Sequence, residues 1–200
     1  MSLTDGEVSR IRAELGYHLI GVDGEPYVGY TSLFDVIIQP YLDAGTSTTS
    51  ATAVTAASSP TPVTLVLTSA TGFSSLARVV IDVDDRTEAV TIQNLSGTSM
   101  TVQLSLAHSG TYPVALADSG EGIVREILKR IRDVKLEMAS SAGEGGIKQV
   151  DEIHFYDSRS TMFSSLGNQL KFWREELSAA LGVASAWSLK SAAAQTLSVY

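Results

Sequence analysis

The sequence contains no cysteine, which excludes a disulfide, a zinc–thiolate site and a thiol nucleophile. Aromatic side chains make up only 7% of the 200 residues, and charged side chains 18%. No segment approaches the roughly 20 consecutive apolar residues that a membrane-spanning helix needs. The first residues lack the basic start and apolar core of a secretory signal. We therefore expect a protein that is made and used in a cytoplasm, or assembled from one, without a membrane partner.

Positive charge is also scarce, because 14 Lys and Arg face 22 Asp and Glu and give a formal net charge of −8. Coating of DNA requires clustered Lys and Arg, so this charge balance argues against such a role. An acidic surface would instead suit a channel through which DNA slides without sticking. Hydrophobic residues are plentiful at 44%, enough for one sizeable domain with or without a smaller insertion.

Apolar residues recur at helical spacing in four segments, which we expect to be helices: residues 3–15, residues 32–42, a segment that starts at Asp118 or Ser119, and a segment from about Asp157 to Gly182. Thr4 or Asp5 can cap the first helix, and Gly16 ends it. Trp173 lies within the apolar stripe of the last helix, so we expect it to pack in the core.

No charged residue occurs from Ala44 to Ala77. The first part of this stretch is rich in Ser and Thr and low in complexity, which is typical of a linker or an extended arm. From residue 63 the apolar residues alternate with a period of two, and we expect four or five strands with a hairpin turn at residues 95–98. Residues 112–116 can add a last strand, in which Pro113 favours the edge of a sheet.

These segments predict an α+β fold, in which a small four-helix bundle is interrupted by an all-β insertion of four to five strands and followed by an extended C-terminal arm. Residues 1–44 and 118–182 form the helical bundle, 45–62 the Ser/Thr-rich linker, 63–117 the β insertion domain and 183–200 the arm. The arm carries one charge and many Ala and Ser residues, so we expect it to order against a partner. Its predicted partner-binding residues are Trp187, Leu189, Leu197, Val199 and Tyr200.

Candidate chemistry is sparse. The histidines His18, His108 and His154 have no metal-ligand spacing, and we interpret them as structural. Asp82 and Asp84 would share one face of a strand, where two carboxylates can bind a divalent cation or share a proton. The alternative, which we favour, leaves these acids on the solvent face or at a turn. No nucleophile elbow, phosphate loop or dinucleotide fingerprint occurs, so the sequence predicts no catalytic, cofactor-binding or metal-binding residue.

Three stretches carry a resemblance to a known family: residues 3–17 (LTDGEVSRIRAELGY), residues 25–34 (EPYVGYTSLF) and residues 172–177 (FWREEL). In these, and in the order helix, helix, β insertion, basic amphipathic helix, the chain resembles the head–tail connector proteins of tailed bacteriophages, also called adaptor or neck proteins, which dock beneath the portal. The resemblance covers most of the chain at the level of layout.

This resemblance implies a non-enzymatic structural protein of the virion, located at the head–tail junction and in the host cytoplasm during assembly. It would form a homo-oligomeric ring, usually a dodecamer, around the DNA channel, with the C-terminal extension inserted into the portal. The implied partners are the portal protein, tail or neck proteins, other copies of the chain, and passing DNA without specific binding.

The β segment departs from the pattern of minimal adaptors, which lack it. Another neck or tail component, such as a tail-completion or decoration-holding protein, therefore stays open. So does an adhesin-like β module that binds a ligand, with the Ser/Thr stretch as its stalk. An enzyme would require Asp82, Asp84 and a histidine to converge.

Overall fold

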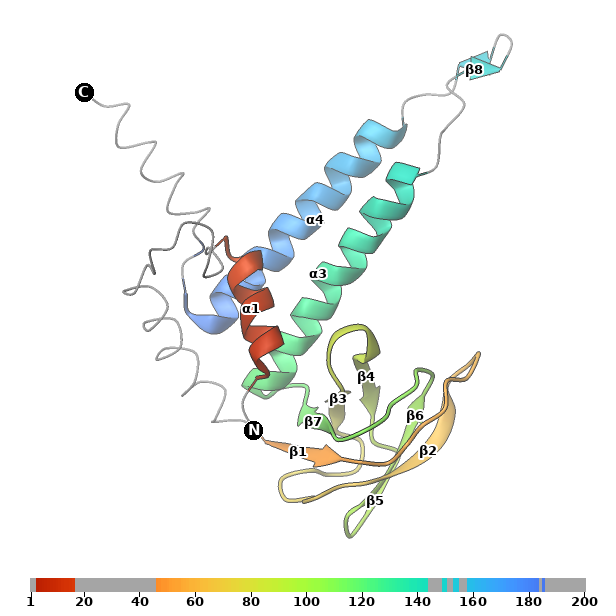
Figure 1. Cartoon of the computed structure of the whole chain (residues 1–200), viewed down its shortest axis with the longest axis vertical. Helices are drawn as coiled ribbons and strands as arrows, with labels where there is room; N and C mark the ends of the chain where they lie inside the picture. The colour runs from red at the N-terminus through yellow and green to blue at the C-terminus, as the bar shows by residue number, and fades with distance from the viewer. Residues whose placement is uncertain are drawn as a thin grey trace, which may run out of the picture.

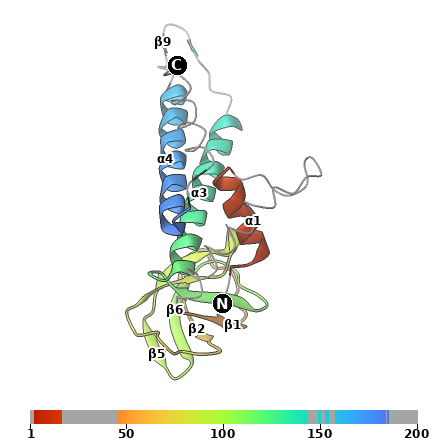
Figure 2. The same ribbon diagram turned by 90° about the vertical axis from the view of Figure 1, so that its left-hand side faces the viewer.

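The computed structural model describes residues 3–16, 46–143, 149–150, 153–154, 158–183 and 185. Within them, helices α1, α3 and α4 stand on a β module that lies at the base of α3 (Figure 1). The view turned by 90° shows α1 packed along the lower part of α3 (Figure 2).

Helix α1 (Asp5–Glu14) begins at a capping box. The Thr4 hydroxyl accepts a hydrogen bond from the Glu7 amide at 3.2 Å, and the Glu7 carboxylate accepts one from the Thr4 amide at 2.8 Å. Gly16 follows the helix with a φ of 80°, a conformation that glycine adopts without strain. The expected cap and stop of this helix are confirmed.

Helices α3 (Gly120–Gly143) and α4 (Ser158–Leu181) run antiparallel as a long hairpin (Figure 1). Ser119 caps α3, since its hydroxyl accepts a hydrogen bond from the Gly122 amide at 3.2 Å. Trp173 packs against the helical core, as expected. The buried residues of this core come from all three helices and their ends: Leu3, Ile11, Leu15, Val124, Ile127, Leu128, Ile131, Leu177 and Leu181.

The β module holds two antiparallel sheets. The four-stranded sheet has the order β1 (Ser47–Ser50), β7 (Tyr112–Leu116), β3 (Arg78–Ile81), β4 (Glu88–Thr91), and the three-stranded sheet has the order β2 (Thr61–Val66), β6 (Ser99–Leu104), β5 (Asn94–Ser96). A 3₁₀ turn, η1 (Asp84–Arg86), joins β3 to β4. Two short strands, β8 (Gln149–Val150) and β9 (Ile153–His154), pair in the connection between α3 and α4.

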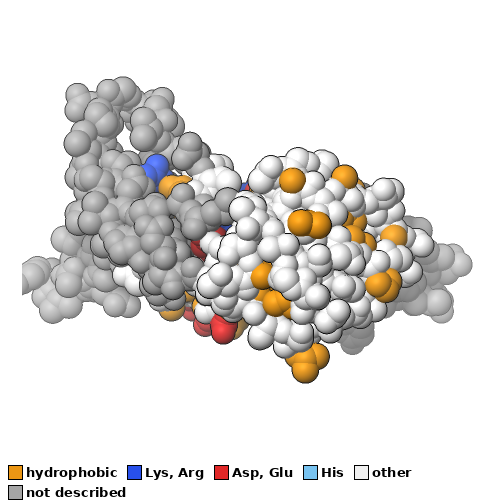
Figure 3. Space-filling model, turned by 90° about the horizontal axis from the view of Figure 1, so that it is seen from below, with side chains coloured by type: hydrophobic (Ala, Val, Ile, Leu, Met, Phe, Trp, Pro, Cys, Tyr) orange, Lys and Arg blue, Asp and Glu red, His pale blue; other side chains and the backbone are white. Residues whose placement is uncertain are grey.

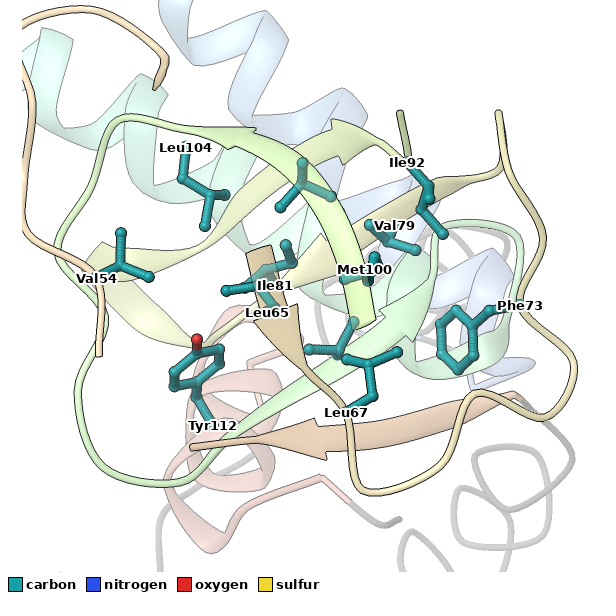
Figure 4. Packing of buried hydrophobic residues seen from close by; sticks show 12 residues of the cluster. Val54, Leu65, Leu67, Phe73, Val79, Ile81, Ile92, Met100, Leu104 and Tyr112 are labelled. Atoms are coloured by element: carbon teal, nitrogen blue, oxygen red, sulfur yellow. The ribbon is translucent and has the colours of Figure 1, made fainter. Parts of the chain in front are cut away.

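The two sheets face each other across a second hydrophobic core, part of which Figure 4 shows. Leu65, Val79, Ile81 and Met100 are fully buried within it. On one side the sheets meet at the bridge between Ser50 and Leu67, and on the other the chain passes from β4 almost directly into β5. The module is thus a flattened barrel with an apolar interior.

The expectation of a four-helix bundle with a β insertion is wrong. The described residues contain three α-helices and two antiparallel sheets of four and three strands, and the β module has a core of its own. The number of helices was misjudged because helical spacing within a segment does not show how many helices share a core. Strand β5 was missed because its one apolar residue, Leu95, made it resemble a turn. The helix expected over residues 32–42 lies outside the described residues.

Two local expectations also need correction. The Ser/Thr-rich stretch 45–62 contains β1, which pairs with β7 from Ser47↔Ala115 to Ser50↔Tyr112, so this part is a strand and not a linker. Pro113 lies in β7, between β1 and β3, and not at a sheet edge. A proline is tolerated there because β3 stops pairing beside it: Asp82 donates its amide to the Pro113 carbonyl at 2.9 Å and then turns away with a φ of 63°.

Candidate functional site

The predicted partner-binding residues Trp187, Leu189, Leu197, Val199 and Tyr200 lie outside the described residues. Val183, the first residue of the expected arm, packs against the helical core, and its carbonyl accepts a hydrogen bond from the Ser178 hydroxyl at 2.5 Å. The segment that could dock into a partner therefore begins after Val183.

His108 forms the most buried polar cluster of the β module. Its Nδ1 lies 2.9 Å from Asp82 Oδ2 and its Nε2 lies 3.0 Å from Glu88 Oε1. The imidazole is 1% exposed, and the Tyr112 ring lies at a centroid distance of 5.2 Å. Glu88 also accepts hydrogen bonds from the amides of Ser105 and Leu106 at 3.0 and 2.7 Å. The cluster thus ties the end of β3 and the start of β4 to the loop after β6.

The electrostatics of this cluster favour a protonated histidine between two carboxylates. Burial lowers the pKa of His108, but its hydrogen bonds to Asp82 and Glu88 outweigh burial and place the pKa above its ordinary value. Burial raises the pKa of Glu88, yet the Leu106 and Ser105 amides and His108 hold it below its ordinary value. Because both ring nitrogens are bound to carboxylates, the imidazole is placed to hold three segments together and not to take a proton from a substrate.

Asp82 and Asp84 are not brought together. Asp82 is 1% exposed and bonded to His108, so the expectation of a solvent face is wrong for this residue. The other half of the preferred interpretation, a turn, is confirmed for Asp84, which lies in η1. Asp84 is exposed and forms an ion pair with Arg10 of α1 at 2.9 Å. The strand ends at Ile81, which breaks the alternation that would have aligned the two carboxylates. Within the part of the chain that the structure describes, no group of three or more His, Asp or Glu side chains is arranged so that it could hold a metal ion.

A second buried cluster joins α1 to α3. Arg125 Nε donates to Glu7 Oε1 at 2.7 Å, and Arg125 Nη1 donates to Glu121 Oε2 at 3.0 Å. All three side chains are at most 2% exposed. Further along α1, Glu14 accepts hydrogen bonds from Lys135 of α3 and Arg174 of α4. Charged residues therefore fix α1 in the helical hairpin at two points.

Ion pairs and a hydrogen bond also join the helices to the β module. Arg132 of α3 donates to the Asp84 carbonyl, and Arg78 of β3 pairs with Glu126 of α3 at 2.7 Å. A shallow cleft lies at this junction and is lined by Glu7, Arg10, Asp84, Thr87, Arg125, Leu128 and Lys129. Its acids and bases are largely engaged with one another, so its visible role is to hold the two parts of the molecule together.

Sequence reasoning missed the roles of His108, Glu88 and Arg125. The partners of His108 are 20 and 26 residues away, and no local pattern announces such a contact. A signal for the second cluster did exist: Glu121 and Arg125 stand four apart on one helix, and Thr4 and Glu7 have the spacing of a capping box. That spacing places Glu7 at the helix start but does not reveal its bond to α3.

None of the helices in the described ranges is long and apolar enough to cross a bilayer. No protein-family model, no curated protein and no solved structure matches this chain.

Proposed function

We propose that this chain is a structural, non-enzymatic protein of a tailed-bacteriophage virion, one subunit of a ring that joins the portal to the tail and surrounds the DNA channel. The proposal starts from the resemblance of residues 3–17, 25–34 and 172–177 to head–tail connector proteins. It assigns the C-terminal segment to the portal and the remaining surfaces to neighbouring subunits and tail components.

The observation that best supports a structural role is how the buried charged groups are used. Arg125 holds α1 on α3, and His108 holds the ends of three segments of the β module. Buried ionic groups of this kind fix one arrangement of elements and lose much of their benefit if either partner moves. A molecule pinned in this way suits a component that transmits load between larger assemblies.

The charge balance supports the channel part of the proposal. A net charge of −8 disfavours adhesion to DNA, which a conduit needs to avoid. In a ring each subunit meets its neighbour through two different surfaces, and closure makes many weak contacts act together.

The proposal is tested by co-expressing the chain with the portal protein of the same phage genome and examining the product by native mass spectrometry and electron microscopy. We expect a ring bound to the portal. Deleting residues 186–200 should abolish this binding while the helical circular dichroism is kept, because Val183 and its core contacts stay in place. A matched control replaces the same residues with a Gly/Ser segment of equal length, which restores length but no apolar side chains.

Portal binding by the truncated chain at wild-type affinity would show that the C-terminal segment is not the docking element. A wild-type chain that binds neither the portal nor itself under any condition would contradict the connector proposal as a whole.

A further inference from the structure

Charge is distributed unevenly over the β module. Every Asp, Glu, Lys and Arg between residues 46 and 117 lies within residues 78–88. Two of them pair with the helices, Arg78 with Glu126 and Asp84 with Arg10, and Asp82 is buried within the module against His108. The rest of the module, including both strands and loops, presents no charged side chain.

The outer face of the sheet β2–β6–β5 belongs to this uncharged surface. Leu65, Met100 and Val102 point into the core, so the alternate residues of the strands point outward. Thr64 lies opposite Thr101, with their hydroxyl oxygens 3.5 Å apart, and Gln103 is exposed on the same face. Seen from below, this side of the molecule is formed by uncharged and hydrophobic side chains, and the charged ones lie at its border (Figure 3).

Leu76 is the most unusual residue of this surface. Its side chain is 79% exposed, and its backbone has a φ of 70°, a left-handed conformation that a leucine rarely adopts. Val66, at the end of β2, is 57% exposed. A bulky apolar side chain whose backbone is strained and which is exposed in the free subunit indicates that burial in a contact with another molecule offsets this cost.

We infer that this uncharged surface, defined by the outer face of β2–β6–β5 and the loop 69–76, is a contact surface for a second copy of this chain. Two copies that each carry a net charge of −8 repel one another wherever their acidic surfaces meet. Within the described residues, the uncharged surface is a place where two copies can approach without that repulsion and without the cost of stripping water from charges. It offers no cations for a nucleic acid.

The contact fits the geometry of a ring. A ring needs two different surfaces on each subunit, whereas one flat face meeting itself would give a closed dimer. The uncharged surface extends over a sheet face and a separate loop, so Leu76 of one copy can insert against the sheet face of the next. This inference rests on the proposed ring function and specifies which part of the chain closes the ring.

Sedimentation velocity of the full chain over a range of concentrations tests whether the uncharged surface is a contact between copies. Wild type should self-associate, and association should strengthen from about 0.05 M to about 0.5 M NaCl, because salt screens repulsion between acidic subunits. The double variant Thr64→Glu/Gln103→Glu should raise the apparent dissociation constant by about tenfold or more. Its matched control, Asn168→Glu/Gln169→Glu, adds the same charge at exposed positions of α4 and should associate much more like wild type.

A Leu76→Gly variant separates folding from association. Glycine adopts a φ of 70° without strain, so the thermal midpoint of the monomer should not fall, while association weakens.

Wild type and both variants, Thr64→Glu/Gln103→Glu and Leu76→Gly, can be compared for ring formation. If all of them form the ring equally well, the uncharged surface is not the contact, and the ring closes through another surface. Equal loss of association in the α4 control would also overturn the assignment, because it would reveal a general effect of charge. A wild-type chain that stays monomeric throughout overturns both this inference and the ring.

Discussion

Among the residues that the structure describes, three other than glycine adopt a left-handed backbone, and they bracket strand β3. Leu76 precedes the strand with a φ of 70°, Asp82 follows it with 63°, and Asp84 lies in η1 with 58°. Such a backbone costs an L-residue about 1–2 kcal/mol, and aspartate tolerates it better than leucine because its short carboxylate can bond locally. Asp82 does so, since its Oδ1 accepts a hydrogen bond from the Val83 amide at 2.8 Å. The left-handed residues thus lie just outside the two ends of β3.

Gly122 provides a sharp test at the residue scale. A Cβ at this position would lie 2.0 Å from the Leu116 carbonyl oxygen, so α3 can start against β7 only if residue 122 has no side chain. Gly122→Ala should lower the free energy of unfolding by about 1–3 kcal/mol or more, as overpacking does. Gly167→Ala in α4 is the matched control, because a Cβ there meets nothing within 4 Å, and it should stabilise by about 0.5–1 kcal/mol. Urea denaturation of both variants should give shifts of opposite sign, and equal shifts would contradict the close approach at Leu116.

His108 makes stability depend on pH. Its pKa is raised above 6.5 in the folded protein, so its contribution is complete below pH 6.5 and is lost as pH rises through the folded-state value. The pKa of Glu88 is lowered below 4.5, so its contribution is present above pH 4.5 and is lost as pH falls through the folded-state value. The contribution of this cluster to the free energy of unfolding should therefore be greatest between about pH 4.5 and 6.5.

Denaturant titrations within this pH range and on both sides of it measure the effect. His108→Gln should remove the decline above pH 6.5, whereas His154→Gln, outside the β module, should keep it. A decline of the same slope in the His108 variant would assign the pH dependence to other groups.

At the scale of elements, the sequence was informative where a signal is local. The cap at Thr4 or Asp5, the period-two alternation of the β segment and the apolar stripe of α3 are local signals, and each indicated the type of its element. Strand β1 could not be found in this way, because Ser47–Ser50 contains no apolar residue and becomes a strand only through β7, more than 60 residues later. The Asp82–His108–Glu88 cluster was hidden for the same reason: it is formed by the pairing of strands, not by spacing along the chain.

The Arg125 cluster predicts how much an element depends on one residue. Arg125→Met removes the cation bonded to two buried carboxylates, those of Glu7 and Glu121, so the free energy of unfolding should fall by about 3–5 kcal/mol. The matched control Arg130→Met removes a cation that is 49% exposed and 3.8 Å from Glu126, and it should cost about 0–1 kcal/mol. Thermal or chemical unfolding measures both, and similar losses in the two variants would mean that α1 is not held by this cluster.

At the scale of the whole molecule, two hydrophobic cores meet at a junction that ion pairs and a hydrogen bond bridge. The helical core joins α1, α3 and α4, while the β module encloses its own. Arg10, Arg78 and Arg132 span the junction. Fully buried Val80 and Ala115 add an apolar contribution, because alternation turns them away from the barrel interior and α3 contacts both of their strands. The molecule is therefore two packed units with one shared helix.

That arrangement predicts a gradient of local stability along the α3–α4 hairpin. Helix α1 covers only its lower part, where Val124, Leu128 and Leu177 are buried, and toward the other end burial thins to Val134 and Leu166 (Figure 1). Local opening costs less where few apolar side chains are buried. In hydrogen exchange followed by mass spectrometry, amides of residues 136–143 should exchange much faster than those of residues 124–131 of the same helix. Uniform protection along α3 in the isolated monomer would contradict the gradient of local stability. Protection of residues 136–143 that appears only on assembly would show that a neighbouring molecule covers the exposed side chain of Leu136.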